Sequence, residues 1–321
     1  MAAVTAQSPS VFASGRFIAD YKKTADLLGA PYSEETIQAT LNNFPGLFEQ
    51  GSVSWRATSR DNDQLNYRFY IPSNVDTISM AAKAGYIDPT KPMARLARGW
   101  SNMFNGEPAE WCDFDSERGL AKTWILLKGL RSVDDLLAAE EVPESTRAHL
   151  DTFHKLGLKY CHFVAVDHDS GTLNLYFTVP GPITEAQAAA YTALAGADPP
   201  TAEEFADMRK YVPEHRFAFA VTIHGSTGKI KRVSIYALNI PEGPLPATAN
   251  DRLRRFFAEA PCYDKVQTRT VGWSYGNGNS KYMKGEASYT GELQNFVKNA
   301  RLPPNEAMAK LLAESKAAMN F

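Results

Sequence analysis

The sequence predicts an α+β fold in which a single ten-stranded antiparallel β-barrel is surrounded by helices. Strand-like runs come in five pairs, and a short polar turn joins each pair. Helical stretches separate the pairs, and the combined unit recurs at a regular spacing. Because closing into a barrel removes the exposed sheet edges, this order favours one closed assembly spanning residues 1–321. Residues 1–14 are expected to form a flexible segment outside the barrel.

The predicted strands alternate polar and apolar side chains, which is typical of sheets with two different faces. The pairs are 52–58 with 64–71, 111–114 with 119–127, 158–166 with 172–179, 217–223 with 229–238, and 269–275 with 281–289. Their connections are rich in Gly, Asn and Asp, as at 61–63 and 276–278, and these residues favour tight turns.

The predicted helices lie between these strand pairs. They span 17–29, 34–43, 76–84, 93–103, 133–140, 144–156, 185–195, 202–211, 250–259, 292–300 and 305–319. Four of them begin after a residue that can accept a hydrogen bond from the first turn, namely Ser33, Ser132, Thr184 and Thr201.

Equivalent polar positions on the second strands show how regular the repeat is. Arg68, Lys122, Asn174, Arg232 and Lys284 are separated by 54, 52, 58 and 52 residues. This spacing predicts five repeats of the type ααββ.

Composition sets the broad class of the protein. The 321 residues include 34 basic and 36 acidic side chains, a net charge of −2, which argues against nucleic acid as a partner. The chain contains neither an apolar run of the roughly 20 residues that span a bilayer nor a secretory signal, so no membrane partner is expected. Three scattered cysteines fit a reducing compartment. We therefore expect a cytoplasmic monomer.

The polar faces of the predicted strands mix cations with aromatic and amide side chains. Arg56, Arg68, Lys122, Asn174, Arg232 and Lys284 lie on such faces, together with Trp124, Tyr176, Tyr236, Tyr282 and the single carboxylate of Glu286. Each strand taken alone could instead present an ordinary solvent face. If the helices cover the apolar faces, however, the cations line the barrel interior and call for a multiply charged anion such as diphosphate.

Several stretches of the chain resemble a known family. They are DQLNYRFY, RGLAKTW, FHKLGLKYCHFVAVD with LNLYF, TGKIKRV, and VGWSYG followed by YMKGEASYTG, and they recur in order across residues 15–300. The ordered set resembles the soluble aromatic prenyltransferases of the ABBA, or prenyltransferase-barrel, class. The resemblance is greatest to the phenol-acting group that includes the clorobiocin-pathway 4-hydroxyphenylpyruvate dimethylallyltransferase.

This resemblance implies an enzyme of secondary metabolism that binds dimethylallyl diphosphate beside an electron-rich aromatic acceptor such as a phenol, naphthol or phenazine. The prenyl group would pass to a ring carbon through an allylic cation. The positions that match the family's diphosphate-binding residues are Arg56, Arg68, Lys122, Asn174, Tyr176, Arg232 and Lys284.

The resemblance also implies the walls of the pocket. Its matching positions are Asn66, Trp124, His162, Phe163, Trp273 and Ser288, with Trp124, Tyr176 and Trp273 lying against the prenyl chain. Glu286 matches a carboxylate that contacts the acceptor's hydroxyl or amine, although it could equally pair with Lys284 on the same strand face. His162 stands where the hydroxyphenylpyruvate enzyme has an arginine that faces the acceptor's carboxylate, so a different acceptor is possible. The alternative is that His162 is an interior histidine with its hydrogen bonds satisfied and no role toward the acceptor.

One departure from the family bears on metal use. Some members carry a magnesium-binding Asp at the position of Asn66, and Arg68 follows on the same strand face. A neutral amide is a poor anchor for Mg²⁺, whereas an added cation can take over its electrostatic role. The pair Asp134-Asp135 fits the first turn of a helix after Ser132 better than a metal site. We expect no bound metal and no cofactor.

Two alternatives remain open from the sequence. The same fold could use a longer donor such as geranyl diphosphate, since the sequence does not give the width of the barrel. A barrel of this kind could also be a non-catalytic carrier of an amphipathic anion.

Overall fold

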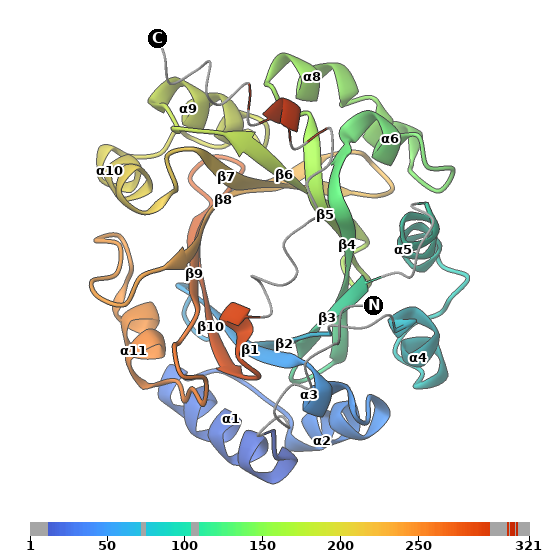
Figure 1. Cartoon of the computed structure of the whole chain (residues 1–321), viewed down its shortest axis with the longest axis vertical. Helices are drawn as coiled ribbons and strands as arrows, with labels where there is room; N and C mark the ends of the chain where they lie inside the picture. Colours follow the sequence, from blue (N-terminus) through green and yellow to red (C-terminus); the bar gives the residue numbers. More distant parts are fainter. Residues whose placement is uncertain are drawn as a thin grey trace, which may run out of the picture.

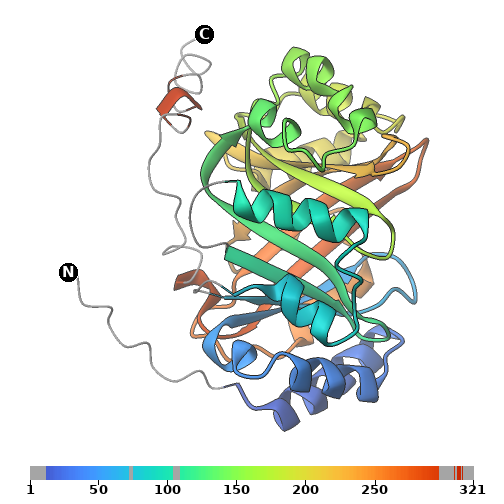
Figure 2. The ribbon, with the colours of Figure 1, turned by 90° about the vertical axis from the view of Figure 1, so that its right-hand side faces the viewer.

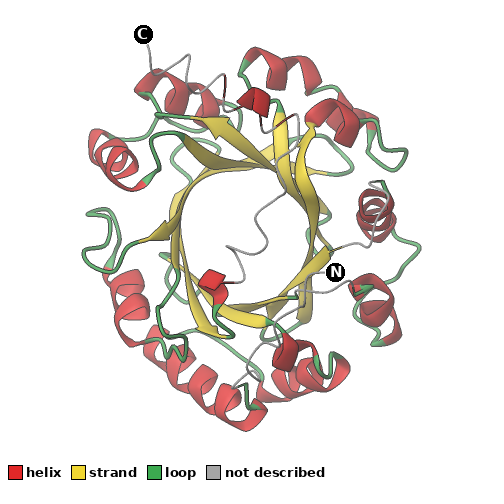
Figure 3. Cartoon of the chain, in the orientation of Figure 1, coloured by secondary structure: helices red, strands yellow, loops and turns green. Residues whose placement is uncertain are grey.

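The computed structural model describes residues 12–71, 75–103 and 109–295, together with residues 307, 309–311 and 313. Ten antiparallel strands close into one barrel in which sequence neighbours pair and β1 pairs with β10. Figures 1 and 3 show the helices as an outer layer around this ring. The predicted fold class is confirmed.

The strands match the predicted runs to within a few residues at most ends. They are β1 (Ser52–Thr58), β2 (Asn66–Tyr70), β3 (Ala109–Asp115), β4 (Gly119–Ser132), β5 (Tyr160–Asp167), β6 (Thr172–Pro180), β7 (Arg216–His224), β8 (Ile230–Ile240), β9 (Arg269–Gly276) and β10 (Lys281–Thr290).

The helices also follow the predicted order. They are α1 (Ser14–Leu28), α2 (Glu34–Asn43), α3 (Leu47–Gln50), α4 (Thr77–Lys83), α5 (Pro92–Asn102), α6 (Val133–Leu137), α7 (Glu144–Arg147), α8 (Leu150–Lys155), α9 (Glu185–Ala193), α10 (Ala202–Tyr211) and α11 (Asp251–Glu259). The four predicted caps form, and that of Thr201 is a full capping box. The predicted helix 144–156 is divided into α7 and α8, and α3 was not predicted.

The repeat is less strict than the sequence spacing suggests. Two helices precede the second and fourth hairpins, whereas α11 alone precedes the fifth. The predicted helices 292–300 and 305–319 lie mostly outside the described residues.

The N-terminal boundary differs from the expectation. Residues 1–11 lie outside the described part, but Phe12 is only 9% exposed and its ring lies 5.5 Å from that of Phe48. Helix α1 begins at Ser14. Phe12 therefore packs into the core beneath α1 and α3, and Ser14 is already the first residue of α1.

The two faces of the sheet have different partners. Leu65, Tyr67 and Phe69 belong to the large core between the strands and the helices, whereas Tyr70 belongs to a separate apolar cluster. The side view in Figure 2 shows the helices packed along the outer wall of the strands. The apolar strand faces therefore point outward and the mixed polar faces point into the barrel, as predicted. No helix in the described part of the chain is long and apolar enough to cross a bilayer.

Candidate functional site

Cross-strand pairing brings the predicted cations together inside the barrel. Arg56 on β1 is paired with Asn66 on one side and with Glu286 on the other. Arg68 on β2 is paired with Asp113 on β3, which is in turn paired with Lys122 on β4. Because directly paired residues share a face, these side chains meet in the interior. Arg68 is only 8% exposed, so its strand does not present a solvent face.

Asp113 is an interior carboxylate that the sequence analysis did not identify. Its carboxylate accepts hydrogen bonds from Arg68 Nη2 at 3.0 Å and from Arg56 Nη1 at 3.2 Å. Although burial opposes ionisation, Arg68 and Arg56 hold the pKa of Asp113 at about 2. The interior therefore holds more than the single carboxylate expected. The alternation of Trp111 and Asp113 along the strand was the available signal for it.

Glu286 is held by three donors from two other strands. Ser54 Oγ donates to Oε1 at 2.9 Å, Arg68 Nη1 donates to Oε2 at 3.1 Å, and the Tyr70 hydroxyl also donates to Oε1. Burial and the nearby carboxylate raise the pKa of Tyr70, with Arg68 opposing, so the phenol keeps its proton. Glu286 thus forms an ion pair with Arg68 and not with Lys284, which was the alternative expectation.

Lys284 and Arg232 make different contacts. Lys284 Nζ donates to Ser234 Oγ at 3.0 Å and to the Tyr236 hydroxyl at 3.2 Å. Arg232 Nη1 donates to the Ser280 carbonyl at 3.2 Å, and its guanidinium lies 4.6 Å from the centre of the Tyr282 ring. Burial opposes ionisation of Tyr282, but Lys284, Arg232 and Arg60 lower its pKa to about 8.

Three interior donors have no acceptor among the residues that the structure describes. Lys122 forms no hydrogen bond or ion pair within the described residues, and its ammonium lies 5.8 Å from the centre of the Trp124 ring. Burial lowers the pKa of Lys122 to about 8, although the charge of Asp167 opposes the shift. Asn174 Nδ2 and Trp124 Nε1 are buried, and neither has a hydrogen-bond partner in the described part of the chain. Buried donors without acceptors are costly, so this arrangement is suited to an anionic ligand.

Aromatic rings form a nearly continuous belt beside the cations. In order along the belt, the rings are those of Tyr236, Tyr176, Trp124, Phe163, Trp111 and Tyr70. The centroid distances from each ring to the next are 6.3, 4.4, 6.2, 5.0 and 4.7 Å. Arg68 lies 4.2 Å above the Trp124 ring. Such π faces next to a charged cluster can stabilise a cation in a desolvated space.

The remaining predicted pocket residues are placed as follows. His162 lies at a bulge of β5, where its Nδ1 is 2.8 Å from Thr178 Oγ1, and burial lowers its pKa to about 3. It is a neutral, hydrogen-bonded histidine. Asn66 Oδ1 is buried and accepts no hydrogen bond from residues 12–71, 75–103 or 109–295. Ser288 Oγ accepts a hydrogen bond from Thr268 N at 3.0 Å and thus anchors the loop 260–268.

Trp273 does not lie in the pocket, and that prediction was wrong. On β9, Gly272 is paired with Lys284 and faces inward, so the next residue faces the helices. Trp273 is 1% exposed, belongs to the outer core, and donates from Nε1 to Thr248 Oγ1 at 3.3 Å. Strand alternation allows either face of β9 to point inward, and only the pairing with β10 decides between them.

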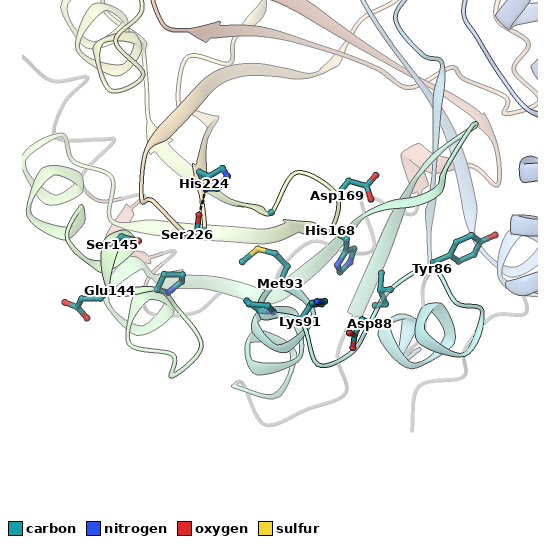
Figure 4. Close-up of a pocket in the computed structure, with 15 residues that line it drawn as sticks. Tyr86, Asp88, Lys91, Met93, Glu144, Ser145, His168, Asp169, His224 and Ser226 are labelled. Atoms are coloured by element: carbon teal, nitrogen blue, oxygen red, sulfur yellow. Dashed lines mark hydrogen bonds between the residues drawn. The ribbon is translucent and has the colours of Figure 1, made fainter.

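A cavity of about 850 Å³ lies away from these residues. Figure 4 shows its lining, which comes from the α4–α5 connection, the start of α7 and the turns that follow β5 and β7. Its polar side chains include Lys91, His168 and Asp169, and none of the predicted site residues lines it. We therefore place the candidate site in the barrel interior.

The interior has few free ligands for a divalent metal. The described residues contain no group of three or more His, Cys, Asp or Glu side chains that could hold a metal ion. Asp113 and Glu286 are both bonded to Arg68, and Asn66 offers only a neutral oxygen. These donors do not fit a magnesium site of the usual carboxylate-and-oxygen kind.

Comparison with known proteins adds to this geometry. Residues 12–301 match the family model described as aromatic prenyltransferase Orf2. A protein of Arthroderma otae named aromatic prenyltransferase is 61% identical over 285 residues, covering 89% of this chain and 91% of that protein. The 4-hydroxyphenylpyruvate 3-dimethylallyltransferase of Streptomyces niveus is 38% identical over 282 residues, covering 88% and 86%.

A solved structure shows the same fold. The 5-dimethylallyl tryptophan synthase from Streptomyces coelicolor superposes with a TM-score of 0.53 at 11% identity, covering 85% of this chain and 94% of that one. The resemblance drawn from the sequence motifs is therefore confirmed. The chain belongs to the aromatic prenyltransferase Orf2 family and is a transferase with the ABBA barrel fold.

Proposed function

We propose that this enzyme transfers a dimethylallyl group from dimethylallyl diphosphate to a carbon of an electron-rich aromatic such as a phenol, naphthol or phenazine. The observation that carries the proposal is a set of interior donors beside the aromatic belt that have no partner among the described residues, namely Lys122, Asn174 Nδ2 and Trp124 Nε1. They suit an anion attached to an apolar chain. The activity named for the Streptomyces niveus relative supports the same donor.

The cations have a direct role in the proposed first step. When the allylic C–O bond breaks, its electron pair leaves with the diphosphate, and the negative charge on that group grows. Hydrogen bonds and ion pairs hold Lys284, Arg56 and Arg68 in place before the reaction, and Lys122 faces them from the neighbouring strand β4. Together these cations stabilise the growing charge. Arg232 extends the same cluster toward the β9–β10 turn.

The aromatic belt and Glu286 act on the other partner. Trp124 and Tyr176, whose ring centroids are 4.4 Å apart, face the allylic cation and exclude water from it. Glu286 accepts a hydrogen bond from the acceptor's hydroxyl or amine and thereby orients the ring. Two ring electrons form the new C–C bond, and the displaced ring proton passes to the released diphosphate.

The test is incubation with dimethylallyl diphosphate and a panel of hydroxynaphthalenes, phenazines, indoles and 4-hydroxyphenylpyruvate. We expect a prenylated product and one diphosphate released per transfer. Stoichiometric binding of dimethylallyl diphosphate without release of diphosphate for any acceptor would instead indicate a carrier. Parallel reactions with geranyl diphosphate decide the donor length, and faster transfer of the ten-carbon group would overturn the dimethylallyl assignment.

A further inference from the structure

The last barrel strand is followed by a tight turn at one end of the barrel. Gly291 and Glu292 have positive φ angles of 97° and 56°, which turn the chain sharply after β10. A Cβ atom on Gly291 would lie 2.5 Å from the carbonyl oxygen of Gly51, so only glycine fits this approach. Figure 1 shows the short helical turn that follows within the outline of the ring, beside β1 and β10, and Figure 2 shows it at one end of the barrel.

Hydrogen bonds fix this turn to its surroundings. The Asp264 carboxylate accepts from the backbone N–H groups of Glu292 at 2.7 Å and Leu293 at 3.1 Å. Ser52 Oγ donates to the Gly291 carbonyl at 2.6 Å. The turn is therefore tied both to the loop 260–268 and to the start of β1.

Leu293 places an apolar side chain among the interior residues. It is 3% exposed and belongs to the apolar cluster that lines the barrel, which is separate from the outer core. The other buried members of that cluster lie on strands and are Tyr70, Trp111, Trp124, Ala165, Tyr176 and Ala220. Among these buried members, Leu293 alone comes from outside the strands.

The position of Leu293 relates it to the acceptor rather than to the diphosphate. Along the chain, Lys284 comes first, then Glu286, and the turn carrying Leu293 follows the end of β10. Ser52, which bonds to this turn, is paired with Tyr70, and the Tyr70 hydroxyl donates to Glu286. Leu293 therefore adjoins the Glu286 side of the interior, away from Lys284.

We propose that Leu293 sets the largest aromatic acceptor that the barrel admits. The inference rests on the proposed function, since it assigns the Glu286 side of the interior to the acceptor. A buried leucine fills space that a larger ring system would need, and close packing makes a change of a few carbon atoms felt. Specificity set by apolar volume typically changes by about 10- to 200-fold for such a difference.

The experiment compares a one-ring phenol with a three-ring hydroxyphenazine as competing acceptors. The specificity ratio is kcat/KM for the three-ring acceptor divided by kcat/KM for the one-ring acceptor. In Leu293→Ala we expect this ratio to rise at least about tenfold. Leu293→Phe should lower the ratio, and the volume-conserving Leu293→Met should leave it within about threefold. Leu150→Ala on the outer helix α8 is the matched control for loss of the same atoms. The KM for dimethylallyl diphosphate should stay within about threefold in every variant.

A second measurement does not depend on turnover. Quenching of tryptophan fluorescence by hydroxyphenazine alone reports binding near Trp111 and Trp124, and its Kd should fall in Leu293→Ala and rise in Leu293→Phe. If neither readout moves beyond the Leu150→Ala control, or if the donor KM changes instead, the proposal is wrong. If the wild type prenylates no acceptor, the proposed function fails. The ranking of the hydroxyphenazine Kd values among Leu293→Ala, the wild type and Leu293→Phe still decides the role of Leu293.

Discussion

Arg68 and Asp113 form a two-point ion pair inside the barrel, with Nη2 and Oδ2 3.0 Å apart and Nε bonded to Oδ1. Both side chains are nearly inaccessible, and Arg68 also reaches Glu286. Burial opposes the charge on Arg68, but Asp113 and Glu286 raise its pKa well above the usual value. One arginine thus connects the carboxylate of β3 with that of β10.

Asp113→Asn should destabilise the fold strongly, because it removes that carboxylate from the buried Arg68 and from Arg56, which is only partly exposed. Breaking one side of a buried pair typically costs about 3–5 kcal/mol of unfolding free energy, measurable by urea denaturation. Glu144→Gln, at a side chain that is 87% exposed, is the control and should change stability by less than about 1 kcal/mol. A loss for Asp113→Asn no larger than the control would show that the pair adds nothing to stability.

The same pair predicts an acid-sensitive contribution. The pKa of Asp113 is lowered to about 2 in the fold from an ordinary value of 3.8. Its stabilisation is therefore fully present above the ordinary value and is lost as the pH falls toward 2. The unfolding free energy, measured by urea denaturation at several pH values between 5 and 2, should fall more steeply with decreasing pH for the wild type than for Asp113→Asn. The same pH dependence in both proteins would contradict the assignment.

Lys122→Ala and Lys284→Ala should each slow the chemical step by about 10²–10³, as loss of one preorganised donor typically does. Rapid-quench measurement of diphosphate release gives this rate directly. Both variants should remain folded. Lys122→Met should be more stable than the wild type near neutral pH, since burial lowers the pKa of Lys122 and charging it in the fold is unfavourable. Full turnover by both alanine variants would rule out the diphosphate site.

Titration of Lys122 should also make kcat/KM for dimethylallyl diphosphate depend on pH. With its pKa lowered to about 8 by burial, the free enzyme loses this positive charge above pH 8, and kcat/KM for dimethylallyl diphosphate should fall there. The surrounding charges are Asp167, Arg56, Asp113 and Lys284.

Tyr282 titrates in the same range, so the pH profile needs a comparison of variants. Its pKa is lowered to about 8 by the neighbouring cations, with burial opposing. The fall in kcat/KM should persist in Tyr282→Phe and disappear in Lys122→Met. The reverse outcome would assign it to the tyrosine.

Activity should persist in excess EDTA, and added Mg²⁺ should change the rate less than about tenfold, or 1.4 kcal/mol. Arg56, Arg68, Lys122, Lys284 and Arg232 carry five positive charges, and Asp113 and Glu286 already offset two of them. The remaining three can balance the roughly three negative charges of an allylic diphosphate. Asn66→Asp should make the rate more responsive to Mg²⁺. Complete loss of turnover in EDTA that Mg²⁺ restores would show that a metal takes part.

The sequence by itself determined the ten strands, their hairpin pairing and the face on which the cations lie. These follow from local signals, namely alternation with a period of two, turn residues and helix caps, which need no knowledge of distant contacts. The outward packing of Tyr67 and Phe69 and the inward position of Arg68 were predicted on that basis.

Only the tertiary structure decided which residues meet across strands. The ion pair of Arg68 with Asp113 joins residues 45 apart in the sequence, and the hydrogen bond of Tyr70 to Glu286 joins residues 216 apart. The contact of Leu293 with the interior cluster comes from a turn beyond the last strand. Likewise, alternation alone leaves Trp273 free to face either way, and its direction follows from the pairing of Gly272 with Lys284. A shift of one residue in register reverses every side chain on a strand, and the register is fixed only when the barrel closes.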